Sequence, residues 1–550
     1  MTSVGFRRLA EYICRLFTGQ NGGYVESFSH LGWEARLWLP AMGGAIAGGL
    51  LWLGARFTQK SSTDYMEAIS LGDGIIPVRS SLVKSASALF SISSGASIGS
   101  EGPLVQLAAV IASLVGRLRH LPPLQLRLLV ACGASAGIAS AYKAPIGGAL
   151  FVAEIILNSL AMESFGPLVF ASVVATLTVR NFLGSDPLYE IDLTVNRTVS
   201  AWEIPPYLIL GILAGLVAPW FLRLLRWSEH LFSSIPAPAF VRLGLGGLVV
   251  GALAIRSPEV CGNGYSTINE VIQGHFVWQA LIVVLALKLL ATAATFGSGA
   301  VGGVFTPTLF AGACLGELFG GLVHRVWLHS PAFSPAHTFA LIGMGAFLAA
   351  TTHAPLMAII MIFELTLDYG IILPLMLACV VAHYTCSAFD KSSVYSESLK
   401  RKGADADAFQ LALSTALVGD LMKADPIAVS ENARFTEIAE CFIRNRFNYL
   451  YVVDESRRFR GVISLHDVKG CLNDSNLAQF IIARDILRDT FPSLLPNDSL
   501  ATALERFSRH DGERLPVVAQ EDSQKLIGSI SKSDLLLALA HQNRETQPAK

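Results

Sequence analysis

A single carboxylate, Glu101, lies in a long apolar segment and is the first residue whose chemistry needs an explanation. Around it the sequence reads SSGASIGSEGP over residues 93–103, so glycines and a proline surround the charge. A charge in a membrane segment costs about 2.5 kcal/mol or more on insertion scales, and it usually faces a cavity or a partner. Glu101 is therefore a candidate functional residue. The alternative is a helix-capping glutamate stabilised by the helix dipole.

The segment around Glu101 has a second copy further along the chain. SGASIGSEGP (94–103) matches SGAVGGVFTP (298–307), with Ser-Gly-Ala and proline at equal spacing. A glycine-rich loop that opens a helix leaves backbone N–H groups free at the positive end of the helix dipole, and such a site binds anions. Pro103 and Pro307 suit first-turn positions, where the missing N–H costs nothing. The residues of the first loop that we expect to face an anion are Gly99, Ser100 and Gly102.

The two copies differ by the acid, because the second loop has no counterpart of Glu101. A carboxylate at an anion-binding helix end competes with a mobile anion, and protonation would neutralise it and free the site. Conduction also requires weak binding, which backbone dipoles provide and a buried lysine would not. The comparison predicts that Glu101 is a pH-sensitive gate.

The elements that must position these loops are short and broken. The apolar segments 104–118 and 145–157 are shorter than the ~20 residues of a straight membrane span. A second pair also repeats, since GASAGIASAYKAPIGGALFVAE (133–154) matches GMGAFLAATTHAPLMAIIMIFE (343–364). Paired Gly/Pro-broken segments point to a site at the membrane midplane, so we expect an all-α membrane region of broken and tilted helices. The glutamates that end the copies, for which we expect an interfacial or packing role, are Glu154 and Glu364.

The composition places most of the chain in a membrane. Of its 550 residues, 52% are hydrophobic and only 15% are charged, against about 25% charged residues in a typical soluble protein. The formal net charge of −1 argues against nucleic acid as a partner. The eight cysteines have neither a CxxC pair nor ligand-like spacing, so we expect neither a metal site nor a disulfide framework.

Changes of composition divide the chain into regions. Residues 1–33 form a basic amphipathic N-terminal segment, residues 34–400 the membrane domain, and residues 401–413 a polar linker. The remainder reads as a soluble α/β pair of repeats, 414–475 and 481–541. Basic residues of the first segment favour a cytoplasmic N-terminus, and they are Arg7, Arg8 and Arg15.

Two pentapeptides, GASIG (95–99) and GASAG (133–137), satisfy the GxSxG pattern of a hydrolase nucleophile. That pattern requires a strand before it, a helix after it, and a histidine and an acid as partners. Neither segment offers this context, and small residues are expected wherever membrane helices pack closely. We therefore expect that the protein is not an enzyme.

At these motifs the membrane region resembles the CLC family of chloride channels and chloride/proton antiporters. GSEGPLVQ (99–106) is similar to the GREGP motif of the family, and GSGAVGGVFTPTLFAGA (297–313) is similar to its GxFxP motif. The segments TDYMEAI (63–69) and GNGYSTI (262–268) are similar to the bacterial branch described as voltage-gated chloride channels. The resemblance implies a homodimer with one pore per subunit and inverted repeats within each subunit.

The resemblance also assigns roles to residues. Glu101 falls on the gating glutamate of the family. Val304 and Phe305 fall on the residues whose backbone amides hold the central anion. Tyr395 falls on the tyrosine whose hydroxyl completes that site, and its presence disfavours fluoride selectivity.

Three positions depart from the family pattern. Ser100 stands where GREGP has an arginine, which weakens the expected attraction of anions at the outer mouth. The motif of the family's serine ligand lacks its glycines here, so we take Ser61, with Ser62 as the alternative. Antiporters commonly carry a second glutamate beside Glu154 that passes protons, and this position is Ile155. Because isoleucine carries no proton, we favour passive conduction, although another internal acid or a file of water could substitute.

The two tail repeats resemble a tandem pair of CBS domains, a regulatory module that often follows CLC membrane domains. Each copy reads strand, helix, strand, turn, strand and helix. Such pairs can bind adenine nucleotides, with a strand-end serine and an aspartate one helical turn later on the ribose. The alternatives are a structural dimerisation module and, for the aspartates, ordinary helix caps. The matching residues are Ser464, Asp467, Ser531 and Asp534.

The sequence thus predicts a passive chloride channel in the inner membrane, with its N-terminus and CBS tail cytoplasmic. Chloride or a similar anion is the transported ion, the bilayer and a second copy are the partners, and an adenine nucleotide at the CBS pair is the one cofactor considered. The first alternative is a chloride/proton antiporter. The second is a ligand sensor whose membrane region only anchors the CBS pair, and it predicts no anion flux.

Overall fold

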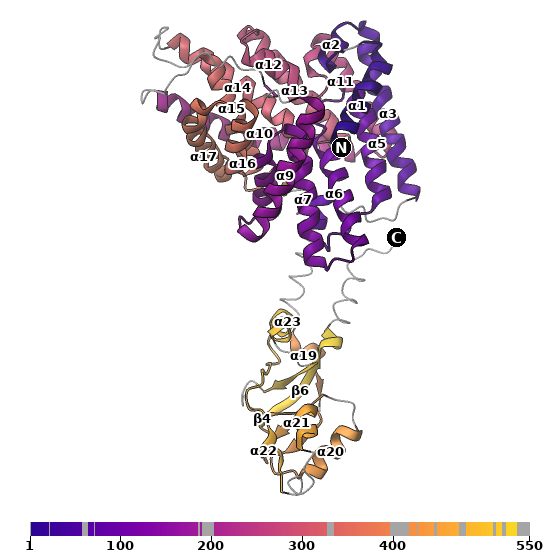
Figure 1. Ribbon diagram of the computed structural model, residues 1–550, viewed down its shortest axis with the longest axis vertical. Helices are drawn as coiled ribbons and strands as arrows, with labels where there is room; N and C mark the ends of the chain where they lie inside the picture. The colour runs from indigo at the N-terminus through magenta and orange to yellow at the C-terminus, as the bar shows by residue number, and fades with distance from the viewer. Residues whose placement is uncertain are drawn as a thin grey trace. The chain divides into compact units, whose positions relative to one another are not determined.

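The chain folds into two compact units, Met1–Lys400 and Arg401–Lys550 (Figure 1). The structure is a computed structural model. The residues that it describes are 2–20, 22–57, 64–70, 72–184, 188–189, 203–326, 335–396, 417–424, 426–444, 448–471, 480–509, 513–519 and 524–535.

The first unit is a bundle of helices (Figure 1). Among the described residues, nine of its helices are long and apolar enough to cross a membrane, and shorter apolar helices accompany them. The predicted all-α membrane region of broken helices is therefore confirmed. Its elements are α1 (Thr2–Thr18), α2 (Tyr24–Ser29), α3 (Trp33–Phe57), α4 (Tyr65–Ser70), α5 (Val78–Ser93), α6 (Glu101–Leu118), α7 (Pro123–Tyr142), α8 (Pro145–Leu150), the π-helix η1 (Phe151–Ile156), α9 (Met162–Leu183), α10 (Ile204–Ser233), α11 (Ala239–Arg256), the 3₁₀ turn η3 (Pro258–Val260), α12 (Tyr265–Ile272), α13 (Trp278–Gly297), α14 (Phe305–Val326), α15 (Ala336–Thr352), α16 (Pro355–Thr366), the 3₁₀ turn η4 (Tyr369–Ile371) and α17 (Ile372–Phe389).

The breaks fall at equivalent places in the two repeats. Lys143 ends α7 and His353 ends α15, both in left-handed backbone (φ 55° and 58°). An Ala-Pro pair then begins the next helix, α8 or α16, with the proline in the first turn, where its missing N–H is not needed. The spacing repeated in the sequence therefore corresponds to a repeated helix–break–helix unit.

Helix α1 is packed into the first unit. The hydroxyls of Ser3 and Ser140 lie 2.5 Å apart, and the Ser93 hydroxyl donates to the Ala10 carbonyl (3.0 Å). The segment 1–33, predicted as a region of its own, thus belongs to the same compact unit as the membrane helices. The buried face of α1 consists of Ser3, Val4, Phe6, Ala10, Cys14 and Thr18.

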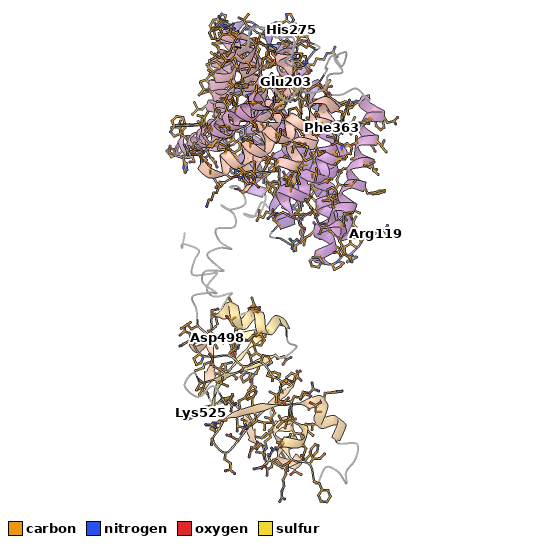
Figure 2. The ribbon with its side chains drawn as sticks, turned by 90° about the vertical axis from the view of Figure 1, so that its left-hand side faces the viewer. Arg119, Glu203, His275, Phe363, Asp498 and Lys525 are labelled. Atoms are coloured by element: carbon orange, nitrogen blue, oxygen red, sulfur yellow. The ribbon has the colours of Figure 1, made fainter. Side chains whose placement is uncertain are left out.

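The outer surface of the first unit is apolar between two polar ends. In Figure 2, Arg119, which follows α6, lies at one end of the bundle, and His275, which follows α12, lies at the opposite end. Large apolar side chains are exposed on the flanks, among them Phe170 of α9 and Trp220 of α10. Exposed apolar surface of this extent marks an interaction surface, and on helices long and apolar enough to cross a membrane it is the surface that faces the lipid.

The second unit contains two small three-stranded sheets, in the orders β1-β6-β5 and β2-β3-β4. Strand β1 comes from the first tail repeat but pairs antiparallel with β6 of the second, with Lys423 opposite Ser529. The first repeat therefore contributes a strand to the sheet of the second, the two repeats fold as one unit, and the predicted α/β class is confirmed. The elements are α19 (Val418–Leu421), β1 (Lys423–Ala424), β2 (Ala428–Ser430), α20 (Phe435–Arg444), β3 (Tyr449–Val453), β4 (Phe459–Ser464), α21 (Leu465–Cys471), α22 (Ala483–Ile486), α23 (Leu500–Arg509), β5 (Arg514–Val518) and β6 (Leu526–Ser531).

Candidate anion pathway

The two glycine-rich loops of the repeats lie against each other. The Gly99 N–H donates to the Gly303 carbonyl (2.7 Å), and the Gly303 N–H donates to the Gly99 carbonyl (2.9 Å), as in an antiparallel sheet. Gly95 and Gly299, which precede them, share a left-handed backbone (φ 94° and 93°) that glycine adopts readily. An antiparallel contact between equivalent residues is what a twofold relation between the repeats produces.

This bridge corrects part of the sequence interpretation. We predict that the glycines of the first loop present free amides to an anion, and for Gly99 this is wrong because its N–H is bonded to Gly303. Helix α6 also begins earlier than predicted, at Glu101 instead of residue 104. Gly102 therefore lies in the first helical turn.

Glu101 is almost completely buried, with 3% of its surface exposed. Its Oε1 accepts hydrogen bonds from the hydroxyls of Tyr142 (2.7 Å) and Thr306. Its Oε2 has no hydrogen-bond partner among the described residues, and it lies against Gly303, where an added Cβ would be 2.8 Å from it. The glycines of the bridge thus leave room for the carboxylate.

The Glu101 carboxylate belongs to a cluster of hydroxyl groups that the sequence interpretation misses. Tyr142 ends α7, Thr306 lies in the first turn of α14, and Tyr265 begins α12. The Thr306 hydroxyl lies 3.1 Å from that of Tyr142 and 3.4 Å from that of Tyr265. Tyr142 lies in the repeated segment 133–154 and Thr306 in the repeated segment 298–307. This position within a repeat is the one sequence signal that could have identified them as residues of the site.

A cavity of about 280 Å³ reaches Glu101 from one side. Of the residues predicted to form the site, it is lined by Glu101, Gly102, Val304 and Tyr395. Phe305 does not line it, because its side chain is buried and its ring packs 4.8 Å from that of Tyr142. The polar side chains of the lining that the sequence interpretation does not name are Asp64, Tyr65, Lys84, Ser85 and Gln106.

The predicted serine ligand, Ser61 or Ser62, lies outside the described residues. The description resumes at Asp64, whose carboxylate caps α4 by accepting from the Tyr65 N–H (2.7 Å). The Gln106 side chain of α6 accepts from the same N–H (2.9 Å). The start of α4 is therefore fixed to α6 beside the cavity.

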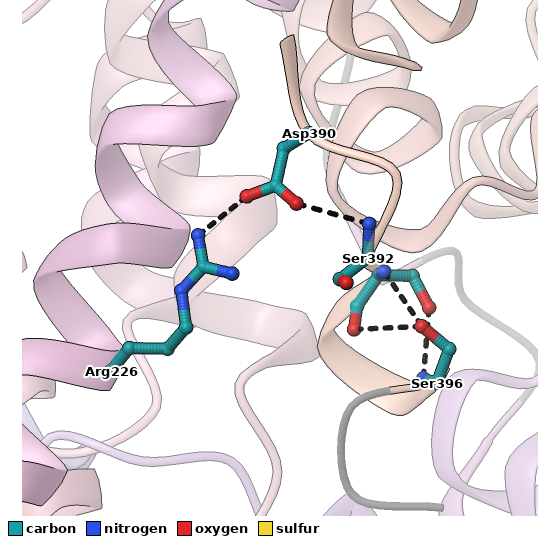
Figure 3. A network of polar contacts seen from close by, with 5 residues as sticks. Arg226, Asp390, Ser392 and Ser396 are labelled. Atoms are coloured by element: carbon teal, nitrogen blue, oxygen red, sulfur yellow. Dashed lines mark hydrogen bonds and ion pairs between the residues drawn. The ribbon is translucent and has the colours of Figure 1, made fainter. Parts of the chain in front are cut away.

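A polar network after α17 holds the segment that carries Tyr395 (Figure 3). Arg226 of α10 forms an ion pair with Asp390 (2.5 Å), and Asp390 also accepts from the Ser392 N–H (3.0 Å). Beyond this turn the Tyr395 ring packs edge-on against Phe151, with 5.3 Å between the ring centroids. The network thus positions Tyr395 at the cavity. Its remaining members in Figure 3 are Ser393 and Ser396.

Glu154 and Glu364, which are equivalent in the repeats, cap each other's helices. The Glu364 carboxylate accepts from the N–H groups of Ile146 and Gly147 at the start of α8 (3.0 and 2.7 Å). The Glu154 carboxylate accepts from the equivalent N–H groups at the start of α16 (3.2 and 2.7 Å). A carboxylate here satisfies free amides and the helix dipole. This reciprocal exchange agrees with the interfacial role expected for both glutamates.

The serine–aspartate pairs of the tail form the same local motif in each repeat. The Ser464 hydroxyl donates to Asp467 (2.7 Å), and the Asp467 N–H donates back to it (3.2 Å). Ser531 and Asp534 repeat the pattern at 2.7 and 3.0 Å. These contacts are those of an ordinary helix cap, the alternative that the sequence leaves open.

Each of these aspartates also pairs with a basic residue of the other tail repeat. Arg488 bonds Asp467 (2.7 Å), and Lys423 bonds Asp534 (3.0 Å). Burial acts to raise the pKa of Asp467, but the hydrogen bonds from Arg488 and Ser464 outweigh it and hold that pKa below its usual value. The hydrogen bond from Ser531 lowers the pKa of Asp534. Both carboxylates are thus ionised and already engaged at neutral pH.

Together these features define a class of membrane transport protein, in which two repeats of broken helices meet around a buried carboxylate. The sequence matches the voltage gated chloride channel family over residues 37–387 and the CBS domain over residues 418–474 and 483–541. The chain therefore belongs to the voltage-gated chloride channel (CLC) family and carries a tandem CBS pair. The resemblance drawn from the motifs is confirmed.

Known relatives agree with this assignment. The chain is 48% identical to a ClcB-like chloride channel protein of Ralstonia nicotianae, in a match that covers 74% of this chain and 95% of that protein. It is 39% identical to the voltage-gated ClC-type chloride channel ClcB of Escherichia coli O6:H1, over 71% of this chain and 94% of that protein.

Solved structures share the fold. A slow cyanobacterial Cl⁻/H⁺ antiporter is 26% identical, with a TM-score of 0.65, over 74% of this chain and 96% of that one. A eukaryotic CLC transporter, 19% identical with a TM-score of 0.59, covers 97% of this chain and 93% of its own. The protein is thus an integral membrane protein of a chloride-transporting family, and its fold is shared with antiporters.

Proposed function

We propose that this protein conducts chloride and similar anions passively and that Glu101 is its protonatable gate. The observation that carries the proposal is the buried carboxylate at the junction of the two glycine loops, beside a cavity. When ionised, it occupies the place of the mobile anion, and when protonated, it gives up that competition. In the same proposal, chloride is held by the amides of Val304 and Phe305, the Tyr395 hydroxyl and Ser61 or Ser62.

The position of Ile155 supports passive conduction over coupled exchange. Ile155 lies in the π-helix Phe151–Ile156 and packs against the apolar core. Its neighbour Glu154 is occupied as a helix cap. Among the described residues that line the cavity, the acids are Asp64 and Glu101. An isoleucine thus stands where the resemblance assigns the inner proton relay.

Exchange of chloride for protons is the second candidate, because the chain shares its fold with a Cl⁻/H⁺ antiporter. Purified protein in liposomes with an outward chloride gradient separates the two. We expect chloride efflux that follows the gradient, with no uphill proton movement recorded by a pH dye. Proton uptake driven by chloride would establish the antiporter instead. The sensor alternative predicts no flux and leaves the paired loops without a role.

For the assembly we propose a homodimer with one pathway per subunit, in the inner membrane, with the CBS tail in the cytoplasm. The family supports the dimer, and the charged composition of the tail supports a water-exposed location. Crosslinking of the reconstituted protein tests the dimer. Protease digestion of the tail in inside-out vesicles tests the orientation, since a tail on the other side would be protected.

We also propose that the CBS pair binds an adenine nucleotide. A ribose at Asp467 or Asp534 would replace the ion pair with Arg488 or Lys423. ATP or AMP at 100 times Kd would stabilise the folded protein by about 2.7 kcal/mol, so we expect the Tm of the tail in the full-length protein to rise by a few degrees. Combining Asp467→Asn with Asp534→Asn should abolish this rise.

The exposed Asp489 provides a matched control for this measurement. Asp489→Asn makes the same chemical change at one position of the same unit, away from the serine–aspartate pairs, and should leave the nucleotide-dependent rise in Tm intact. If no adenine nucleotide shifts the Tm of the unmodified protein, the tail is a structural module and the serine–aspartate pairs are helix caps alone.

A further inference from the structure

A second cavity, also of about 280 Å³, lies beside the loop that leads to Glu101. Ser100, the residue just before Glu101, is part of its lining. The lining also includes Asn263 and Tyr265, from the segment that begins α12, and Arg7 from α1. Tyr265 also reaches the Thr306 hydroxyl of the Glu101 cluster (3.4 Å), so this lining shares a residue with the cluster around the gate.

Arg7 is held in a fixed position at this cavity. Its guanidinium donates to the carbonyl of Ala141, and the next residue, Tyr142, donates to Glu101 (2.7 Å). Helix α1 therefore brings a cation to the immediate surroundings of the gate.

The segment that begins α12 is also anchored. The buried Lys288 of α13 donates to the carbonyls of Val260 and Gly262 (both 2.9 Å), just before Asn263. The one acid in the described lining is Glu11, which is exposed on α1, so water and salt screen its charge more than that of the half-buried Arg7. The cavity thus presents a positioned cation together with neutral donors.

We propose that Arg7 and Ser100 form an anion-binding vestibule that delivers chloride or a similar small anion to Glu101. The motif that surrounds Glu101 has an arginine at position 100 in the family, and this chain has serine there. Because Arg7 and Ser100 line the same cavity, the positive charge missing from α6 is supplied by α1. This inference rests on the proposed chloride conduction, and it identifies Arg7 as the residue that attracts the chloride ion.

Chloride flux in liposomes, measured against chloride concentration, tests the vestibule. Arg7→Gln removes the charge but keeps a side-chain donor for the Ala141 carbonyl. We expect the chloride concentration at half-maximal flux to rise roughly tenfold, because a charged cleft raises the local ion concentration by at least that order, with little change in maximal flux. Adding Ser100→Arg to the Arg7→Gln variant should restore the original value.

Arg8 supplies the matched control, because it neighbours Arg7 on α1 but is exposed. Arg8→Gln should leave the half-maximal concentration unchanged. An equal shift in both variants, or no shift in Arg7→Gln, overturns the vestibule. If Arg7→Gln does not fold, the single variant Ser100→Arg tests the proposal. A second cation in the cavity must lower the chloride concentration at half-maximal flux. An unchanged concentration refutes the proposal. Absence of flux in the unmodified protein would instead refute the proposed function and the vestibule with it.

Discussion

Glu101→Gln should make chloride flux through the reconstituted protein nearly independent of pH. Gln has the size of the protonated acid and can still accept the Tyr142 hydroxyl (2.7 Å in the native protein), but it carries no charge to compete with the anion. In the unmodified protein the protonated fraction of a carboxyl falls about tenfold for each pH unit above its pKa. We therefore expect its flux to fall as pH rises, while the variant keeps at neutral pH the flux that the unmodified protein reaches in acid.

The measurement is the initial rate of chloride efflux from liposomes between acid and neutral pH. Glu163→Gln is a suitable control, because Glu163 is exposed in the first turn of α9, and it should retain the native pH profile. A Glu101→Gln variant whose flux still falls with pH as in the native protein would return Glu101 to the alternative interpretation, a helix-capping residue.

Gly303→Ala should open the gate at neutral pH without removing the carboxylate. The added Cβ would lie 2.8 Å from Glu101 Oε2, nearer than real Cβ contacts allow, so the side chain of Glu101 must leave its pocket. The φ of Gly303 is not among the left-handed ones, so alanine introduces no backbone strain there. We expect flux at neutral pH to rise severalfold and its pH dependence to weaken.

A double-mutant cycle with Glu101→Gln shows whether Gly303→Ala acts through the gate. Residues in contact give non-additive effects, so the alanine should add little to a variant whose gate is already neutral. Gly321→Ala in α14, the helix that follows the Gly303 loop, is the control, because nothing lies within 4 Å of its added Cβ. Gly303→Ala could instead lower flux by the same factor in the native and in the Glu101→Gln background. That result would mean that the added methyl blocks the pathway itself and does not act by displacing the Glu101 side chain.

Much of this architecture follows from the order of residues along the chain. The apolar composition, the change to a polar tail and the repeated spacings identify a membrane domain of two repeats and a pair of α/β repeats. The breaks at Lys143 and His353 follow from the Ala-Pro pairs, because proline restricts the residue before it and begins the next helix. Glu101 also stands out in sequence alone, since an isolated charge in an apolar segment is costly.

The surroundings of Glu101 depend on contacts between residues that are far apart in the sequence. The bridge between Gly99 and Gly303 uses the amide that the sequence suggests is free. The hydroxyls of Tyr142 and Thr306 meet at the carboxylate only when the end of α7 and the start of α14 come together at the start of α6. Spacing along one segment carries no information about such partners.

The amino-acid sequence by itself thus determined the class of protein, its repeats and the acid at its centre, because hydropathy, periodicity and motif spacing are properties of the chain. Only the tertiary structure decided which groups that acid meets, that Glu154 and Glu364 exchange caps, and that α1 brings Arg7 to the cavity of Ser100. The physical reason is that backbone amides and charges find partners through packing, and the twofold relation of the repeats joins positions that no local pattern connects.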